Sequence, residues 1–495
     1  MRFAARSVFI ILLFSGMLST AGRAGVSALE LKGCSAGHAR VAALCGSYKV
    51  FEDRASRTGR KVTISFIVLK AETATNKAIF WNPGGPGAGA TQFADLIADG
   101  LLEPYLTRLR DRYNIVLVDN RGTGASNELS CDLYHPAEPA PFFLQLWPDA
   151  ALRKCRAALA RAADLGKYTT DLAADDLDDI RAALNFPKIA LSGVSGGTQF
   201  FLDYARRHPD HVESLLLQGV APPHFLIIPL EDARGAQLAI DHLMKACDQD
   251  RACAAQFPSF RRHFAALAAR FDRGPVTIKA HNPVTHEMQT LLLSKEVFGD
   301  RLRQTTYERA TAAYVPFIIE RAYRRDYEPL ATMVQDVTAD FGALVPAGVN
   351  LSITCAEDIP FITSVDVTRA STNTFVGDSR VRAQQRACQI WNIPAVPRAY
   401  QDPVRTAAPL LMISGADDPT TPPEYSLEAL PYFRNGARLV IANTSHDTYT
   451  VPCAMRLAEE FIRRRSSRKL DTAGCAGVNR RPPFRTSMEG FDGHT

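Results

Sequence analysis

The sequence predicts an α/β fold, in which a mostly parallel sheet carries helices on both faces and a helical segment is inserted. Helical stretches such as 171–186 and 198–209 separate several predicted strands, and strand–helix alternation is typical of parallel sheets. The strands are apolar, β-branched runs without polar alternation, as expected where both faces are covered. These runs are 62–71, 77–81, 114–119, 188–193, 214–220, 409–415 and 437–443.

Length and composition are sufficient for a large core and more than one structural unit. The chain has 495 residues, of which 46% are hydrophobic. After residue 221 the sequence becomes rich in Ala, Arg and helical patterns such as RRHFAALAARF, which predicts a helical insertion. We therefore predict a signal peptide (1–28), the first part of the core (29–221), the helical insertion (222–405), the second part of the core (406–485) and a C-terminal tail (486–495).

The N-terminus has the pattern of a secretory signal peptide. Two arginines lie within residues 1–6, the apolar run SVFIILLFSGML follows, and small residues stand at Ala21, Ala24 and Ala28. A membrane span needs about 20 apolar residues, and this run is shorter. We therefore expect a secreted or periplasmic protein with no stable membrane insertion after signal cleavage.

Cysteine usage agrees with export. The ten cysteines are even in number, which predicts disulfides in an oxidising compartment. Zinc is the alternative, but the sequence has no paired CxxC motif, so we expect no metal. Neighbouring cysteines along the chain suggest the pairs 34–45, 131–155, 247–253, 355–388 and 453–475.

The charge balance does not indicate a nucleic-acid partner. The net charge is only +5, from 57 basic and 52 acidic residues. The one dense basic run, at residues 463–469, ends a predicted helix, where cations interact favourably with the helix dipole. We interpret this run as a solvated helix end.

A serine stands where a strand turns sharply into a helix. The pattern Gly193–Val–Ser195–Gly–Gly197 lies between the predicted strand KIALSG and the helical stretch TQFFLDYARR. On such a turn a serine hydroxyl is held out on a strained corner, as a nucleophile requires. The context therefore predicts that Ser195 is a catalytic nucleophile.

A serine nucleophile needs a base and a group that orients the base. In this architecture the acid and then the histidine follow late strands. Asp417 and Asp418 follow the run 409–415, and His446 follows the run 437–443. The order and placement predict His446 as the base and one of the two aspartates as its partner.

The loop WNPGGPG after the predicted strand 77–81 is suited to an oxyanion hole. An acyl-transfer intermediate needs two preorganised N–H donors. One is expected from Gly196, directly after the nucleophile, and the other from the loop that follows a neighbouring strand. We predict that Gly85 supplies the second amide and that the prolines stiffen its loop.

The sequence contains the motifs NPGGPG, VDNRGTGAS, YTTDLAADDLDDIRAAL, GVSGGT and GADDPTTP. Together they resemble the prolyl and tripeptidyl aminopeptidases of serine peptidase family S33. The resemblance implies an α/β-hydrolase core with a helical cap inserted after the sixth strand. It matches Ser195, Asp418 and His446 to the family's triad, which favours Asp418 over Asp417. It also places Asp119, Arg121 and Gly124 on a D-x-R-G-x-G motif that shapes the site.

The sequence departs from the family pattern at three positions. Gly196 stands where a bulky residue is usual, and Pro83 replaces a histidine common before the Gly-Gly-Pro-Gly loop. Asp447 follows His446 in place of a glycine, and a carboxylate there would raise the pKa of the imidazole. These changes affect the expected shape of the substrate site rather than its chemistry.

An aminopeptidase must recognise a free α-amine, and a carboxylate of the cap is the simplest partner. The segment CAEDIP offers Glu357 and Asp358, and PLEDAR offers Glu231 and Asp232. An ordinary solvated acid is the competing interpretation of each of these residues.

The leading hypothesis is a secreted serine hydrolase that releases N-terminal residues or short peptides through an acyl-enzyme, without a cofactor. An esterase or amidase acting on small acyl substrates with the same triad is the alternative, and a non-catalytic binding protein is a third interpretation. Asn350 and Asn443 fit glycosylation sequons. The scissile residue, the number of residues released and the oligomeric state are not specified by these motifs.

Overall fold

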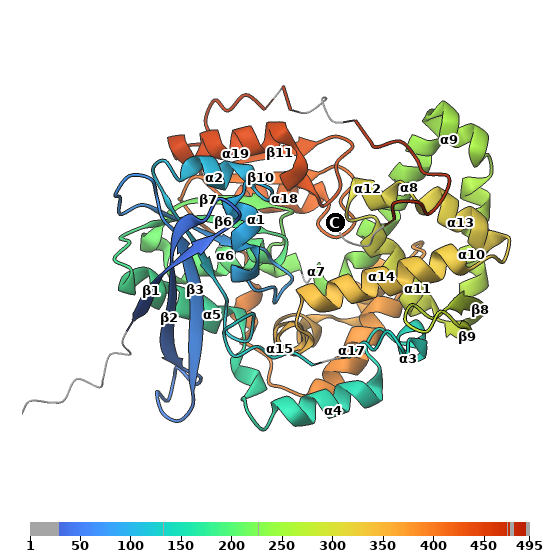
Figure 1. Cartoon of the computed structure of the whole chain (residues 1–495), viewed down its shortest axis with the longest axis horizontal. Helices are drawn as coiled ribbons and strands as arrows, with labels where there is room; N and C mark the ends of the chain where they lie inside the picture. The colour runs from blue at the N-terminus through green and yellow to red at the C-terminus, as the bar shows by residue number, and fades with distance from the viewer. Residues whose placement is uncertain (1–28, 132, 226, 473, 476–479, 492–495) are drawn as a thin grey trace, which may run out of the picture.

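The computed structural model describes residues 29–131, 133–225, 227–472, 474–475 and 480–491. Figure 1 shows a sheet-containing core at one end of the molecule and a helical region at the other. The signal peptide expected at residues 1–28 lies outside the described residues.

The core contains a nine-stranded sheet with the order β1-β2-β3-β5-β4-β6-β7-β10-β11. β1, β2 and β3 pair in antiparallel fashion, β3 is antiparallel to β5, and every later pair is parallel. The strands are β1 (Glu30–Ala36), β2 (Val41–Phe51), β3 (Lys61–Leu69), β4 (Ala78–Asn82), β5 (Asn114–Val118), β6 (Ile189–Val194), β7 (Val212–Gln218), β10 (Leu410–Gly415) and β11 (Gly436–Ile441).

Helices cover both faces of this sheet, as the apolar runs predicted. β4, β6 and β10 are buried at every position, because side chains on each face meet a helix layer. One layer consists of α1 (Ala94–Ala98), α2 (Pro104–Leu109) and α19 (Pro452–Arg464), and the other of α5 (Thr170–Ala183), α6 (Gly196–Arg207) and α18 (Pro423–Ala429).

The N-terminal hairpin of β1 and β2 extends the sheet beyond the predicted strands. Its sequence, ELKGCSA followed by VAALCGSYKVF, is rich in small and polar residues and lacks a continuous apolar run. The backbone pairing is nevertheless regular, and the disulfide between Cys34 and Cys45 ties the two strands together. In chain order, β7 is the seventh strand, and the helical insertion follows it.

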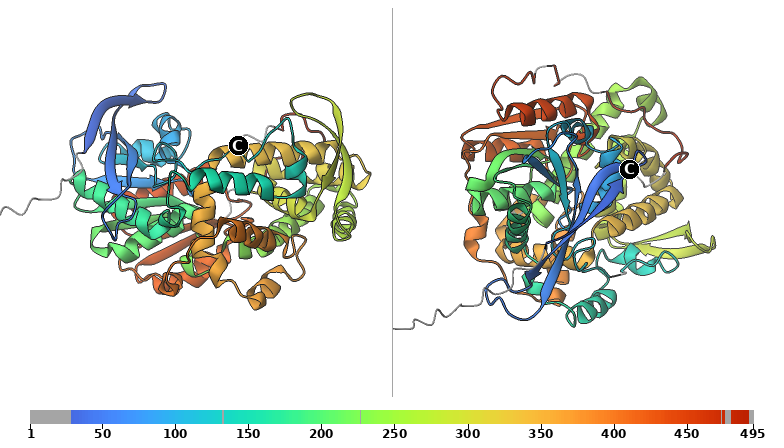
Figure 2. Two further views of the ribbon diagram at one scale, coloured as in Figure 1. Left: turned by 90° about the horizontal axis from the view of Figure 1, so that it is seen from below. Right: turned by 60° about the vertical axis from the view of Figure 1, so that its left-hand side comes forward.

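Residues 222–405, the predicted helical insertion, contain most of a separate hydrophobic cluster and lie beside the sheet in the left view of Figure 2. We refer to these residues as the cap. A small hairpin projects from it. The cap elements are α7 (Ile227–Leu230), α8 (Asp232–Gln249), α9 (Arg251–Gln256), α10 (Phe260–Phe271), β8 (Val276–His281), β9 (Met288–Leu293), α11 (Lys295–Thr305), α12 (Arg309–Ala312), α13 (Val315–Tyr323), α14 (Glu328–Leu344), α15 (Ala347–Glu357), α16 (Ser364–Ser371) and α17 (Ser379–Trp391).

Two segments outside 222–405 also pack on the cap. α3 (Ala140–Leu144) contacts β9, and α4 (Asp149–Leu159) contacts α17. The C-terminal segment 480–491 crosses from the core to the cap, as Figure 1 shows, where Phe484, Met488 and Phe491 pack against the cap core. The stretch from α3 to α4 and the C-terminal segment therefore pack on the cap, although the sequence analysis placed them outside it.

The ten cysteines form the five disulfides that the sequence suggested. The bonds join 34–45, 131–155, 247–253, 355–388 and 453–475.

No single helix among the described residues has the length and apolar composition needed to cross a membrane. One bent pair, Glu328–Leu344 with Ala347–Phe361, meets the length and composition criteria across an 82° bend.

Candidate active site

Ser195 occupies the sharp turn between β6 and α6. Its φ of 54° is rare for a residue with a side chain and is typical of strained functional positions. The turn is held by a hydrogen bond of 2.8 Å from the Ser195 amide to the carbonyl of Gln218 at the end of β7. A Cβ atom at Gly193 would lie 2.5 Å from the carbonyl oxygen of Gly197, so the glycines permit the strand and helix to meet.

The glycine-rich loop after β4 packs directly on this turn. Gly84 has a φ of +99°, and a Cβ atom there would lie 2.9 Å from the amide nitrogen of Gly196. A Cβ atom at Gly196 would in turn lie 3.0 Å from the nitrogen of Pro86. A side chain at position 196 would therefore crowd the glycine-rich loop.

The loops after β10 and β11 bring the predicted acid and base together. His446 Nδ1 lies 2.7 Å from Asp418 Oδ2. Asp418 is fully buried and accepts hydrogen bonds from the amides of Thr420 at 2.9 Å and Thr421 at 2.8 Å. These bonds fix the carboxylate toward the imidazole.

The neighbouring aspartate has different partners. Asp417 Oδ1 lies 2.7 Å from Nδ1 of His242, and Asp417 Oδ2 accepts a hydrogen bond of 2.6 Å from Arg481. His242 belongs to α8 of the cap, and Arg481 belongs to the C-terminal segment. Of the two aspartates left open by position alone, Asp418 is therefore the one that contacts His446.

The environment of His446 favours its protonated form. Burial alone lowers the pKa of the imidazole, but the carboxylates of Asp418 and Asp447 outweigh it and raise the pKa above its ordinary value of 6.5. Asp447 is itself paired with Arg309 of the cap, at 2.9 Å. Asp447 thus raises the pKa of His446, as the sequence predicted.

Ser195, His446 and Gly85 line one large cavity between the core and the cap, with a volume of about 1230 Å³. Among the described residues no hydrogen bond joins the Ser195 hydroxyl to His446, a contact that is often long in the absence of substrate. Much of the wall is apolar or aromatic, formed by Trp81, Phe93, Leu96, Leu101, Leu102, Leu133, Tyr134, Phe142, Leu146, Trp147, Phe341 and Leu344.

The cap forms hydrogen bonds with two of the predicted catalytic loops, the loop of His446 and the glycine-rich loop after β4. The amide of His446 donates to the carbonyl of Tyr307 at 2.9 Å, and the hydroxyl of Ser445 donates to the carbonyl of Thr306. On the opposite side, Asn350 of α15 donates its side-chain amide to the carbonyl of Pro86 at 3.0 Å. Contacts from the cap therefore help to position both the histidine loop and the glycine-rich loop.

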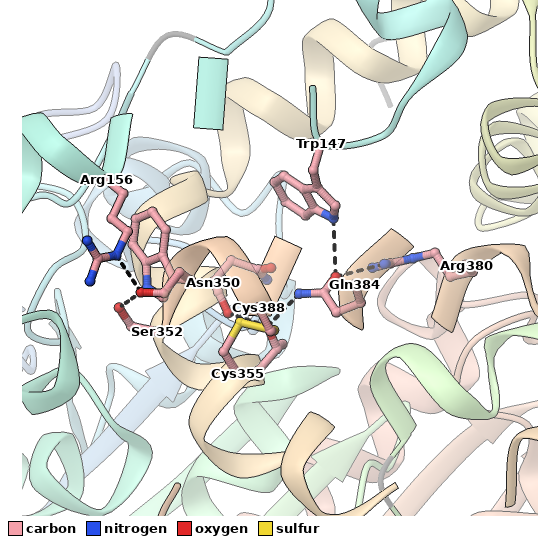
Figure 3. Close-up of a disulfide and its surroundings, with 10 residues drawn as sticks. Trp147, Arg156, Asn350, Ser352, Cys355, Arg380, Gln384 and Cys388 are labelled. Atoms are coloured by element: carbon pink, nitrogen blue, oxygen red, sulfur yellow. Dashed lines mark hydrogen bonds between the residues drawn. A yellow bond between two sulfur atoms is a disulfide. The ribbon is translucent and has the colours of Figure 1, made fainter. Parts of the chain in front are cut away.

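The helix that carries Asn350 is braced by a disulfide and a polar network, shown in Figure 3. Cys355 of α15 is bonded to Cys388 of α17. Gln384 of α17 donates to the hydroxyl of Thr354 at 2.8 Å and accepts from the indole of Trp147 at 3.2 Å. These contacts hold α15 against α17 and the segment before α4.

A buried ionic cluster links the cap to the loop of Asp418. Arg303 contacts Asp300 at 2.9 Å and Asp232 at 3.3 Å, and the hydroxyl of Thr420 donates to Asp232 at 2.9 Å. Burial raises the pKa of Asp300, but the surrounding arginines outweigh it and bring the pKa to about 2. Asp300 therefore stays ionised, and the contacts of Asp232 with Arg303 and Thr420 restrain the position of the acid loop.

The D-x-R-G-x-G motif forms buried contacts that hold the loops next to the site. Asp119 is buried and accepts hydrogen bonds from the amide and hydroxyl of Thr91, at 2.8 and 2.7 Å. Arg121 forms a two-pronged ion pair with Asp176, at 2.7 and 2.9 Å. A Cβ atom at Gly124 would lie 2.4 Å from Asp119 Oδ2, which explains the glycine. The motif shapes the loops and does not line the large cavity.

Three of the four acids expected to meet a substrate amine are not brought to the cavity, which corrects the expectation for Glu357, Asp358 and Glu231. The fourth, Asp232, lines the cavity but contacts Arg303 at 3.3 Å. Glu357 is 0% exposed and accepts from the amide and hydroxyl of Thr170 at 2.6 and 2.8 Å. Burial raises its pKa to about 8 and the pKa of Asp358 well above its ordinary value. Glu231 is buried and faces Arg234 at 3.6 Å. None of the three lines the cavity.

An acid that the sequence analysis missed does line it. Glu103 lies in the segment LLEP between α1 and α2, is 1% exposed, and has an αL backbone with φ of 48°. Burial raises its pKa to about 7. A lone glutamate before a proline carries no sequence signal, and only its burial at the cavity that Ser195 also lines distinguishes it.

One side-chain group among the described residues has the spacing of a metal site. It consists of Asp178, His208 and His211, whose potential ligand atoms lie within 4.8 Å of one another. Asp178 Oδ1 already accepts from Arg181 at 2.6 Å and from Tyr204 at 2.8 Å. The guanidinium neutralises the carboxylate, so the group fits an ion-pair network better than a metal.

The fold and the arrangement of loops define an α/β-hydrolase. A family model described as alpha/beta hydrolase fold matches residues 77–451. The chain belongs to that family, and the predicted fold class is confirmed.

The curated relatives include peptidases. The chain is 27% identical over 225 residues to the serine protease Hip1 of Mycobacterium tuberculosis, covering 43% of this chain and 42% of that protein. It is 29% identical over 193 residues to the tripeptidyl aminopeptidase of Streptomyces lividans, covering 36% and 35%. The solved proline iminopeptidase of Mycobacterium smegmatis aligns over 85% of this chain and 98% of its own, at 16% identity and a TM-score of 0.39. The chain thus matches less than half the length of either curated relative.

Proposed function

We propose that the protein is an extracytoplasmic serine hydrolase, and specifically an aminopeptidase that releases N-terminal residues or short peptides. The observation that carries the proposal is the 2.7 Å contact between His446 and Asp418 at a cavity that Ser195 also lines. The peptidase names of the relatives support the substrate class, and the five disulfides support an oxidising compartment.

In the proposed reaction, Ser195 Oγ attacks the substrate carbonyl while His446 Nε2 takes the hydroxyl proton. Asp418 orients the imidazole and stabilises its cation. The amides of Gly85 and Gly196 stabilise the oxyanion, and His446 then returns the proton to the leaving amine. In the second half of the reaction, His446 takes a proton from water, the water attacks the acyl-enzyme carbonyl, and the proton returns to Ser195 Oγ as the carboxylic acid product leaves.

Kinetics of wild type and Ser195→Ala on aminoacyl and tripeptidyl amides test this proposal. The variant should fold normally and lose at least about 10³-fold in kcat. Full activity in Ser195→Ala would overturn the mechanism.

An esterase acting on small acyl substrates is the second candidate, favoured by the apolar walls of the cavity. Parallel assays with N-terminally free peptides and neutral acyl esters discriminate the two candidates. A clear preference for the neutral esters would favour the esterase.

A further inference from the structure

One section of the cavity wall combines apolar side chains with a single buried carboxylate. It is formed by the end of β4 and the segment from α1 to α2, and Trp81 and Phe93 pack edge to face there, with ring centroids 5.5 Å apart. Leu101 is 71% exposed, which places an apolar side chain on the open side. We call this section the Glu103 wall, and its members are Trp81, Phe93, Leu96, Leu101, Leu102 and Glu103.

The carboxylate of Glu103 is only half satisfied. Oε1 accepts a hydrogen bond of 2.7 Å from the side chain of Gln218, whereas Oε2 has no hydrogen-bond partner among the described residues. The indole N–H of Trp81 is buried and has no hydrogen-bond partner in the part of the chain that the structure describes, but it lies close enough to the carboxyl of Glu103 to lower the pKa of that group. An unpartnered buried carboxylate oxygen is costly, so its presence beside a cavity points to a ligand that completes it.

Gln218 connects this carboxylate to the nucleophile. Its side chain binds Glu103, and its carbonyl accepts the amide of Ser195 at 2.8 Å. Glu103 is therefore one residue removed from the turn that carries the serine. A group bound to Glu103 would lie in the cavity that Ser195 also lines.

Five other acids line the cavity, and three of them are paired with arginines. Asp232 and Asp300 contact Arg303, and Asp447 contacts Arg309. Of the other two, Glu308 accepts a hydrogen bond of 2.8 Å from the hydroxyl of Tyr449, and Asp340 lies on α14. Among the described residues no ion pair joins Glu103 to an arginine or lysine; burial raises its pKa to about 7, and Gln218 and Trp81 lower it in part. A cation placed against this carboxyl would restore its ionised form.

We propose that Glu103 is a specificity-determining residue that binds an ammonium group of the substrate, with the methylene or apolar part lying along the Glu103 wall. This inference rests on the proposed hydrolase function. The ammonium has two possible sources, the free α-amine of a peptide or the side chain of a basic residue. Both present a positively charged N–H donor to an unpaired, buried carboxylate oxygen.

The test compares wild type with Glu103→Gln on four matched substrates. Two differ only in a free or acetylated N-terminus, and two differ only in lysine or norleucine beside the scissile bond. Wild type should prefer the cationic member of at least one pair. Glu103→Gln should lower kcat/KM for that member by about 30-fold and change the neutral member by less than about threefold. The affected pair identifies the source of the ammonium.

Two comparisons keep the result interpretable. Glu428→Gln makes the same change on the exposed surface of α18 and should leave all four rates unchanged, and thermal melting reports on folding of each variant. Equal losses on cationic and neutral substrates, or a wild-type enzyme without cation preference, would overturn the inference. The Ser195-dependent turnover of neutral esters would still stand in that case, so failure here is distinct from failure of the proposed function.

Discussion

The side-chain amide of Asn350, on cap helix α15, donates a 3.0 Å hydrogen bond to the carbonyl of Pro86 in the glycine-rich loop. Asn350 is buried, so its sequon is not available as an exposed glycosylation site. A residue of the cap thus sets the position of a loop that we propose to bind the oxyanion.

Asn350→Ala should therefore reduce catalysis more than substrate binding. Displacing an oxyanion loop by a fraction of an ångström is expected to lower kcat by about 10-fold or more, with a smaller change in KM. Ser352→Ala is the matched control, because Ser352 lies on the same helix but binds the indole of Trp391 at 3.1 Å. Similar kcat values for the two variants would contradict the role of Asn350.

The adjacent aspartates should respond very differently to substitution. Asp418→Asn removes the charge that orients His446 and should lower kcat by about 10⁴-fold. Asp417→Asn disturbs only the contacts with His242 and Arg481 and should cost less than about 10-fold. Steady-state kinetics and melting temperatures of both variants check this expectation, and a larger loss for Asp417→Asn would reassign the acid.

The acid limb of the pH–activity profile should depend on Asp447. His446 must be neutral to accept the serine proton, and Asp447 helps to raise its pKa. Asp447→Asn should therefore lower the pKa of His446, so that activity persists to lower pH. The control is Asp402→Asn, an equal charge change at an exposed position. If the acid limb of Asp447→Asn stayed at the wild-type pH or moved to higher pH, Asp447 would not be a residue that raises the pKa of His446.

The disulfides should contribute unequally to stability. The bond between Cys355 and Cys388 closes a loop of 33 residues, and loop-closure entropy predicts a loss of about 4 kcal/mol when both cysteines become serine. The bond between Cys247 and Cys253 spans 6 residues and should contribute about 2 kcal/mol. Denaturant unfolding of the two double variants measures the difference, and the reverse order would show that strain or residual structure dominates.

The parallel part of the fold and the triad loops could be predicted from the sequence because their signals are local. Continuous apolar runs identify buried strands, and Ser195, Asp418 and His446 each follow one of them. The hairpin of β1 and β2 was missed because its pairing depends on backbone bonds between segments of small residues. Its stability comes from partners that no local pattern reveals.

The substrate side of the cavity could not be predicted, because it depends on contacts between distant segments. The acids of CAEDIP were expected to face the substrate, but Glu357 turns inward to Thr170. Asn350 carried the pattern of a glycosylation site, and Glu103 carried no pattern. The functional interest of both residues follows from burial and from the loops that they touch.

Covalent labelling by a fluorophosphonate, followed by peptide mapping, tests most directly whether the three loops act as one catalytic unit. We predict stoichiometric modification of Ser195 in the wild type, none in Ser195→Ala, and strongly slowed modification in His446→Ala. An unlabelled wild type, a label on another residue, or undiminished labelling in His446→Ala would contradict the account.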